Sequence, residues 1–98
     1  MTPPLFTMIS GQFWSVERCQ LETKKDGSWW GECSEDDKRI RIDERVSGIQ
    51  EADTVIHEYM HAAWPFMSEE EVTKRATELT NLLDLMDLLN CRKQEEAA

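Results

Sequence analysis

The second half of the chain shows the apolar spacing of two helices. Residues 49–63 place apolar side chains on one helical face, and Pro65 prevents that helix from continuing. A second helix is predicted to begin after Ser68 and to run to about residue 92. The serine-x-x-Gln/Glu pattern of a capping box occurs before each helix, as Ser47 with Gln50 and as Ser68 with Glu71.

Each predicted helix carries an apolar stripe. The stripes consist of Ile49, Ala52, Ile56, Met60 and Ala63 in the first helix and of Leu79, Leu82, Leu83, Met86 and Leu89 in the second. Leu85 and Leu88 widen the second stripe beyond what one small sheet needs. We favour core packing against the first helix and the sheet. The alternative is that part of the C-terminal helix docks a second subunit, giving a homodimer, or a partner protein.

The first half of the chain has the shorter patterns of β-strands. Residues 5–16 are rich in aromatic and β-branched side chains and are broken at Ser10-Gly11, which predicts one bent strand or a tight hairpin. After a turn at residues 24–27, residues 29–33 indicate a short strand, and residues 39–43 alternate with period two. The last two segments are expected to pair antiparallel across an acidic turn.

These patterns together predict an α+β fold. A small antiparallel sheet of about three strands packs on the first helix and on a long C-terminal helix. Ninety-eight residues form a single domain, 1–98, with frayed ends at residues 1–4 and about 93–98.

The charge and composition of the chain limit the binding partners and the cellular compartment that we expect. The net charge is −9, of which residues 51–98 carry −7 (4 Lys/Arg against 11 acids), so neither nucleic acid nor an anionic membrane is expected to bind. No apolar run reaches the length of a membrane span. Three cysteines without a C-x-x-C pair, in a chain without a basic-then-apolar leader, predict a reducing, cytoplasmic location.

The strongest chemical pattern is H-E-x-x-H at residues 57–61, which contains both histidines of the chain. On a helix, His57 and His61 lie one turn apart on the same face and can bind one Zn²⁺ from the same side. Glu58 is displaced around the helix, where it reaches a water on the metal without ligating the metal. This is the arrangement of a metal-dependent hydrolase. A solvated polar face that carries two histidines is the alternative.

A catalytic zinc ion normally takes three protein ligands, so one ligand is missing from this motif. Three glutamates follow one another after Pro65. Glu69 lies on the same side of the second helix as Val72 and is the predicted third ligand, with Glu70 in reserve, because Glu71 is already used by the capping box. Acidic residues in a first turn also complement the helix dipole without any metal.

These residues resemble the zincin metallopeptidases that carry H-E-x-x-H, and among them the smallest gluzincin-like domains. Similar domains occur in ImmA/IrrE-like and SprT-like proteins and in short bacteriophage proteins. The resemblance runs from about residue 31 to residue 83 and includes Glu69-x-x-Val72, which is similar to the Glu-x-x-Ala helix start of that family. Only H-E-x-x-H is specific. No third histidine follows at the metzincin spacing, which excludes that branch.

The resemblance implies hydrolysis of a peptide bond in a peptide or protein substrate, with zinc polarising the scissile carbonyl. Glu58 would take the proton of the zinc-bound water and pass it to the leaving amine. The substrate would lie along residues 39–43 as an added strand. One alternative is a non-catalytic zincin-like module that binds a partner protein through the exposed strand or the leucine-rich helix. Another is a structural zinc site completed by Cys33 or Cys91, for which the C-x-x-C knuckle is missing.

Overall fold

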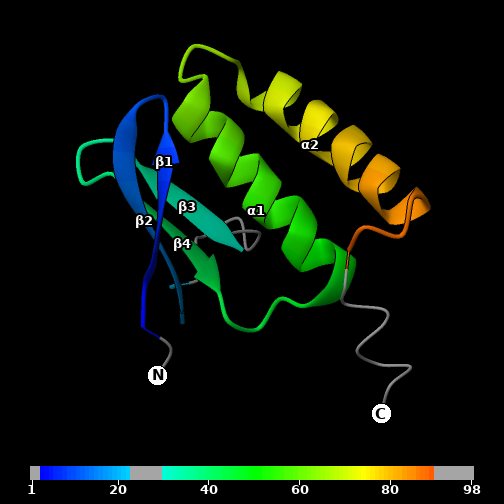
Figure 1. The fold of residues 1–98 in the computed structure, drawn as a ribbon, viewed down its shortest axis with the longest axis horizontal. Coiled ribbons are helices and arrows are strands. Elements are labelled where there is room, and N and C mark those ends of the chain that lie inside the picture. The colour runs from blue at the N-terminus through cyan, green and yellow to red at the C-terminus, as the bar shows by residue number, and fades with distance from the viewer. Residues whose placement is uncertain (1–2, 23–29, 90–98) are drawn as a thin grey trace.

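A computed structural model describes residues 3–22 and 30–89. Its elements are β1 (Leu5–Ile9), β2 (Gln12–Cys19), β3 (Gly31–Ser34), β4 (Arg39–Asp43), α1 (Gly48–Ala63) and α2 (Glu69–Leu85). They form three layers: α1 lies across one face of the sheet, and α2 packs on the side of α1 that faces away from the sheet (Figure 1). The α+β class expected from the sequence is confirmed.

The sheet contains four strands in the order β1-β2-β4-β3. Residues 5–16 take the hairpin alternative, with Ser10 and Gly11 at φ values of 51° and 79° in a tight turn between β1 and β2. The predicted antiparallel pair of β3 and β4 forms. β2 and β4 run parallel, so the sheet is mixed and has one strand more than the sequence patterns indicate.

The strand order corrects one expectation about the substrate. An added strand along residues 39–43 requires a free edge there, but β4 is hydrogen-bonded to β2 on one side and to β3 on the other. Within the described part of the chain, the edge strands are β1 and β3. An added peptide strand can therefore pair with β3 or β1 but not with β4.

The core is divided by α1 into two clusters. The first lies between the sheet and α1 and contains Ile9, Trp14, Ile40, Ile42, Val46 and Ala62. The second lies between the helices and contains Met60, Val72 and Ala76. The helix that carries H-E-x-x-H is thus held from both sides, and its histidine positions fall between the two apolar clusters.

The predicted α2 stripe is wrong as a description of the core. The buried residues of α2 are Val72, Ala76 and Thr80, each four positions after the last, whereas Leu79 and Leu82 are 38% and 51% exposed. The stripe predicted for residues 49–63 is also only partly buried, because Met60 is in the core but Ile49 is 39% exposed. Since α2 packs on a single neighbour, α1, it needs only a narrow buried face.

The helix boundaries agree with the sequence at three of four ends. α1 begins one residue before the predicted range and stops at Ala63, and α2 begins right after Ser68. The far end of α2 differs, because the helix stops at Leu85 and Asp87 has a left-handed φ of 58°. The predicted turn at 24–27, Trp29, Cys91 and the tail after residue 92 lie outside the described residues. Neither described helix has the length and apolar character needed to cross a bilayer.

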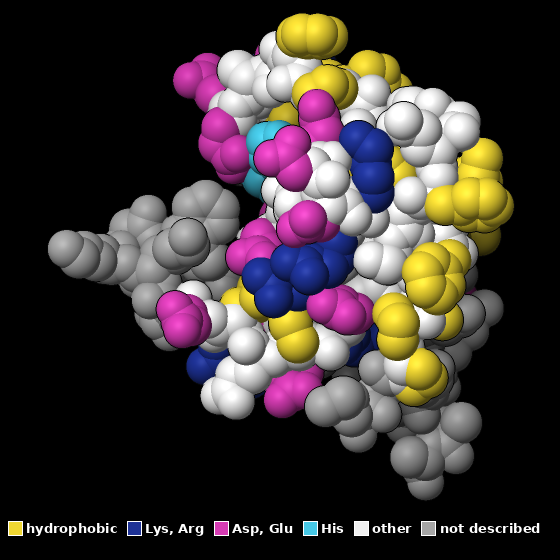
Figure 2. All heavy atoms as spheres, turned by 90° about the vertical axis from the view of Figure 1, so that its left-hand side faces the viewer, with side chains coloured by type: hydrophobic (Ala, Val, Ile, Leu, Met, Phe, Trp, Pro, Cys, Tyr) yellow, Lys and Arg dark blue, Asp and Glu magenta, His cyan; other side chains and the backbone are white. Residues whose placement is uncertain are grey.

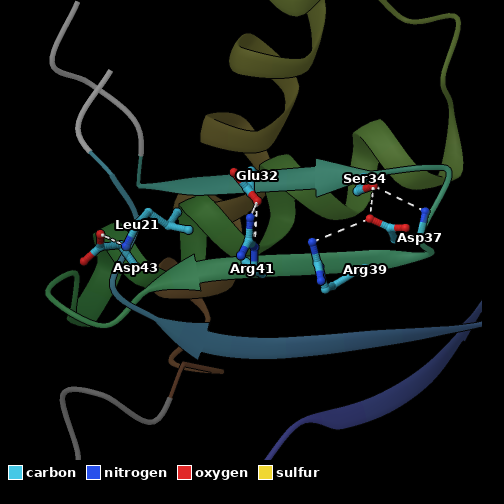
Figure 3. Close-up of polar contacts among 7 residues, drawn as sticks. All are labelled: Leu21, Glu32, Ser34, Asp37, Arg39, Arg41 and Asp43. Atoms are coloured by element: carbon cyan, nitrogen blue, oxygen red, sulfur yellow. Dashed lines mark hydrogen bonds and ion pairs between the residues drawn. The ribbon is translucent and has the colours of Figure 1, made fainter. Parts of the chain in front are cut away.

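The open face of the sheet carries a group of polar contacts around β3 and β4 (Figure 3). Arg41 on β4 pairs with Glu32 on β3, with 2.6 Å between Arg41 Nε and Glu32 Oε1. At the end of β4, the buried Asp43 accepts hydrogen bonds from the side chain of Arg45 and from the backbone N–H of Leu21. The Arg41–Glu32 pair thus links β3 to β4, and the Asp43 contacts link the end of β4 to the segment that follows β2.

Candidate metal centre

Three predicted ligands come from two consecutive helices. His57 and His61 lie one turn apart in the last half of α1, and Glu69 is the first residue of α2. The short reversal between the helices is held by backbone hydrogen bonds from Trp64 N–H to Met60 C=O and from Met67 N–H to Trp64 C=O. The chain therefore reverses within the eight residues from His61 to Glu69, and Glu69 lies against the face of α1 that carries the histidines.

The donor atoms of the three side chains converge. His61 Nε2 is 3.2 Å from His57 Nε2 and 2.7 Å from Glu69 Oε1, and His57 Nε2 is 3.0 Å from Glu69 Oε2. Nitrogen and oxygen ligands lie about 2.0–2.2 Å from zinc, so tetrahedral neighbours are roughly 3.4 Å apart. Two imidazole nitrogens and one carboxylate, at this spacing, fit a divalent ion such as Zn²⁺ and leave a coordination position free.

The alternative ligands are placed elsewhere. The carboxylate of Glu71 pairs with Arg75 at 2.6 Å, and Glu71 N–H donates to Ser68 Oγ at the start of α2. Glu70 and Cys33 do not belong to the ligand group, which is the one set of three potential ligands that the described residues bring within 4.8 Å. The structure thus places Glu69, and not the reserve Glu70, with the two histidines.

Glu58 points in another direction from its neighbour His57. Its side chain lies on the side of α1 that faces the sheet, the residue as a whole is 5% exposed, and the side chain makes no hydrogen bond to any described residue. Burial raises the pKa of the Glu58 carboxyl to about 7, and the charges of Glu69 and Glu32 act in the same direction. A carboxyl with this pKa exchanges its proton near neutral pH.

Gly31, at the start of β3, makes room for that carboxyl. A Cβ atom built on Gly31 would lie 2.9 Å from Glu58 Cγ, 3.1 Å from Glu58 Oε2 and 2.8 Å from Thr54 Cγ2. The edge strand therefore approaches α1 as closely as its backbone allows. The sequence patterns place Gly31 in a strand without giving it a role, because this contact depends on the packing of β3 against α1.

The ligand group is open to solvent. The side chains of His57 and His61 are 20% and 27% exposed, and that of Glu69 is 62% exposed. Figure 2 shows the histidine side chains at the surface, bordered by acidic side chains. A substrate can thus reach the three ligands directly, while Glu58 stays buried beside them.

Comparisons with protein-family models, with curated proteins and with solved structures find no match to the chain. Its function is therefore inferred from the fold and from the geometry of the site.

Proposed function

We propose that this chain is a zinc-dependent metallopeptidase of the zincin type. The observation that carries the proposal is the convergence of His57, His61 and Glu69, together with the buried carboxyl of Glu58, which follows His57 on α1 and lies close enough to Glu69 to be affected by its charge. Chance pairing of an exposed glutamate with a histidine is common, but a bare buried carboxyl beside such a group is costly to the fold. Perturbed, buried ionisable groups cluster at functional sites.

Each residue has a defined task in the proposed reaction. His57, His61 and Glu69 hold the ion, and bound zinc supplies Lewis acidity that polarises a carbonyl and acidifies water. Glu58 takes the proton from the attacking water and delivers it to the leaving amine, for which its raised pKa is suited.

The substrate is a peptide segment in an extended conformation. We place it along the outer edge of β3, to which no strand of the described residues is paired, since β3 lies against α1 and β4 is enclosed on both sides. Backbone hydrogen bonds to an edge strand hold a peptide of varied sequence in one direction. The scissile bond would then lie next to Gly31, where Glu58 meets the strand.

Metal analysis and peptide hydrolysis test the proposal. The purified protein should bind one equivalent of zinc, and His57→Ala or Glu69→Ala should lower zinc affinity by at least about tenfold, whereas Glu70→Ala should leave it unchanged. Glu58→Gln should keep the zinc and lose hydrolysis by at least about 10²-fold on any cleaved peptide of a library. Full zinc retention in both ligand variants would refute the metal site, and equal turnover by Glu58→Gln would refute its role as base.

A second candidate is a zincin-like interaction module without catalysis. It is favoured by the exposed leucines of α2, which the core does not use. In that case a partner protein would bind Glu58→Gln as tightly as the wild type, and no peptide would be cut by either.

A further inference from the structure

A second surface, away from the metal ligands, is strongly apolar. Its six side chains are between 37% and 82% exposed and come from the middle of α1 and the C-terminal half of α2. They are Val55, Leu79, Leu82, Leu85, Met86 and Leu88, of which Met86 and Leu88 follow the end of α2, and we call them the helical apolar surface. Isolated exposed leucines are ordinary, but six exposed aliphatic side chains on one helix pair are typical of a contact surface.

A groove lies between α1 and the C-terminal end of α2 with the residues that follow it, and Val55 and Leu88 of the helical apolar surface line it. Its volume is about 370 Å³, and its walls are mainly aliphatic: Ala52, Val55, Ile56, Leu83, Leu88 and Leu89. At one end, Arg18 Nε and Glu51 Oε2 form an ion pair at 2.7 Å, which neutralises the charge there. Protruding leucines therefore lie next to a hollow that accepts aliphatic side chains.

The helical apolar surface and the ligand group lie on opposite sides of the helix pair. On α2, Glu69 and Thr73 share one side, with 3.4 Å between Thr73 Oγ1 and Glu69 Oε2. The helical period puts Leu79 and Leu82 on the other side of the buried Val72–Ala76 line. A molecule bound to this surface thus leaves the histidines open.

We propose that a second copy of this chain covers the helical apolar surface. In a two-fold symmetric dimer, Leu82 and Leu85 of each copy would insert into the groove of the other. The same surface would then be self-complementary, as a two-fold interface requires. Taking about 200 Å² for a fully exposed large side chain, the six residues offer roughly 650 Å² per copy. With a polar rim this reaches the roughly 800 Å² per partner found in stable interfaces.

The charge of the chain sets how this pairing responds to salt. Each copy carries a net charge of −9, so two copies repel one another outside the apolar contact. Salt screens this repulsion and strengthens apolar association, so the dimer should tighten as salt is added. A complex of the same surface with a basic partner protein would weaken under the same conditions.

Sedimentation of the full chain at micromolar to millimolar concentrations tests the proposal. The wild type should form a dimer, and Leu85→Ser should raise the dissociation constant by at least about tenfold. Leu85 is 82% exposed, so this change should leave the fold intact, which circular dichroism checks. Leu82→Glu on the same surface should give the same result.

The controls use exposed apolar residues elsewhere. Phe66→Ser, at a fully exposed position between the helices, and Phe6→Ser, at a 69% exposed position on the edge strand β1, should leave the dimer unchanged. A wild type that stays monomeric at millimolar concentration overturns the proposal, and so does a dimer that is lost with Phe6→Ser but kept with Leu85→Ser. Zinc content should be equal in all four variants, so the outcome is independent of the metal site.

Discussion

At the scale of single residues, two contacts join segments of the fold. The side chains of Glu58 and Thr54 occupy the space that a side chain at Gly31 would need. Asp43, at the end of β4, accepts a hydrogen bond from Leu21 N–H in the segment after β2. Both contacts join residues that are distant in sequence. Each can be tested by a change of a few atoms.

Adding one methyl group at Gly31 should displace the Glu58 carboxyl. Gly31→Ala places a carbon 2.8 Å from Thr54 Cγ2 and 2.9 Å from Glu58 Cγ, so we expect a loss of about 1–3 kcal/mol in the free energy of unfolding. Hydrolysis should fall further than zinc affinity, because the ligands are not touched. In a variant that also carries Thr54→Ser and Glu58→Ala, Gly31→Ala should leave the free energy of unfolding in urea nearly unchanged, because the two contacting groups are gone. An equal loss of stability in both backgrounds would show that another contact requires the glycine.

The stability of the fold at low pH should depend on Asp43. Hydrogen bonds from the Arg45 side chain hold the pKa of this carboxyl well below its usual range, and those from the backbone N–H groups of Arg45 and Leu21 add to the effect against the opposing effect of burial. The charged form is therefore favoured by folding, and its contribution is complete above the unfolded pKa of about 3.9 and decreases as the pH falls below it.

Asp43→Asn should lower the free energy of unfolding by about 2 kcal/mol at pH 7. The difference from the wild type should narrow when urea unfolding is repeated at about pH 3, where the wild-type contribution is already decreasing. Asp36→Asn, in the exposed turn between β3 and β4, serves as the matched control and should have little effect. A difference that stays constant with pH would mean that shape, and not charge, is what Asp43 contributes.

At the scale of elements, the two capping boxes predicted from the sequence have different outcomes. Ser68 Oγ accepts a hydrogen bond from Glu71 N–H at 3.1 Å and begins α2 as expected. Ser47 makes no such side-chain bond, and the next residue, Gly48, has a left-handed φ of 63°. A serine-x-x-Gln pattern cannot reveal this backbone turn.

The two serines, Ser47 and Ser68, allow a matched experiment. Ser68→Ala should lower the free energy of unfolding by about 1 kcal/mol, because a helix N–H loses its partner, whereas Ser47→Ala should change it by no more than a few tenths. Because Ser68 precedes Glu69, zinc affinity should also fall slightly in Ser68→Ala. Thermal unfolding of both variants, with and without zinc, measures the two effects; equal losses in the two apo variants would contradict the assignment.

How much the sequence could predict depends on the range of the interactions. The extent of α1 depends on local periodicity and is confirmed, and of the two alternatives for residues 5–16 the structure has the hairpin that turns at Ser10-Gly11. The second strand of the hairpin runs on to Cys19, three residues beyond the predicted segment. The parallel pairing of β2 with β4 and the burial of Thr80 in place of Leu79 depend on neighbours that no local pattern specifies. The candidate metal ligands could be chosen from the sequence because the spacing of His57 and His61 is itself local, whereas the contact of Gly31 with α1 could not be predicted.

At the scale of the whole molecule, the ligand group bridges two helices that otherwise meet through one small apolar cluster. Met60, Val72 and Ala76 are its buried members, and Asp53 adds only long contacts of 3.5 Å to the hydroxyls of Thr77 and Thr80. A bound ion would therefore act as a cross-link between α1 and α2. Small domains gain much of their stability from such links.

Zinc should raise the melting temperature of the protein. At about 100 times the dissociation constant, a ligand that binds only the folded state adds about 2.7 kcal/mol, which for a chain of this size corresponds to a shift of roughly 10–20 °C. Calorimetry with zinc, and then with a chelator, measures the shift. Glu69→Ala should abolish most of it and Glu70→Ala none; an equal shift in both would place the ion elsewhere.

The bare carboxyl of Glu58 has an evolutionary consequence. If Glu58 is the base that we propose, descendants of this chain without that activity would be free to replace it with methionine or glutamine. The fold would then become more stable, because an apolar or neutral group suits that enclosed space better. Homologues selected only for stability should therefore lose the glutamate at position 58 while they keep the glycine at position 31, which lies against it. Under the proposed mechanism, the residue that would act as the base is thus one whose loss the fold itself would favour.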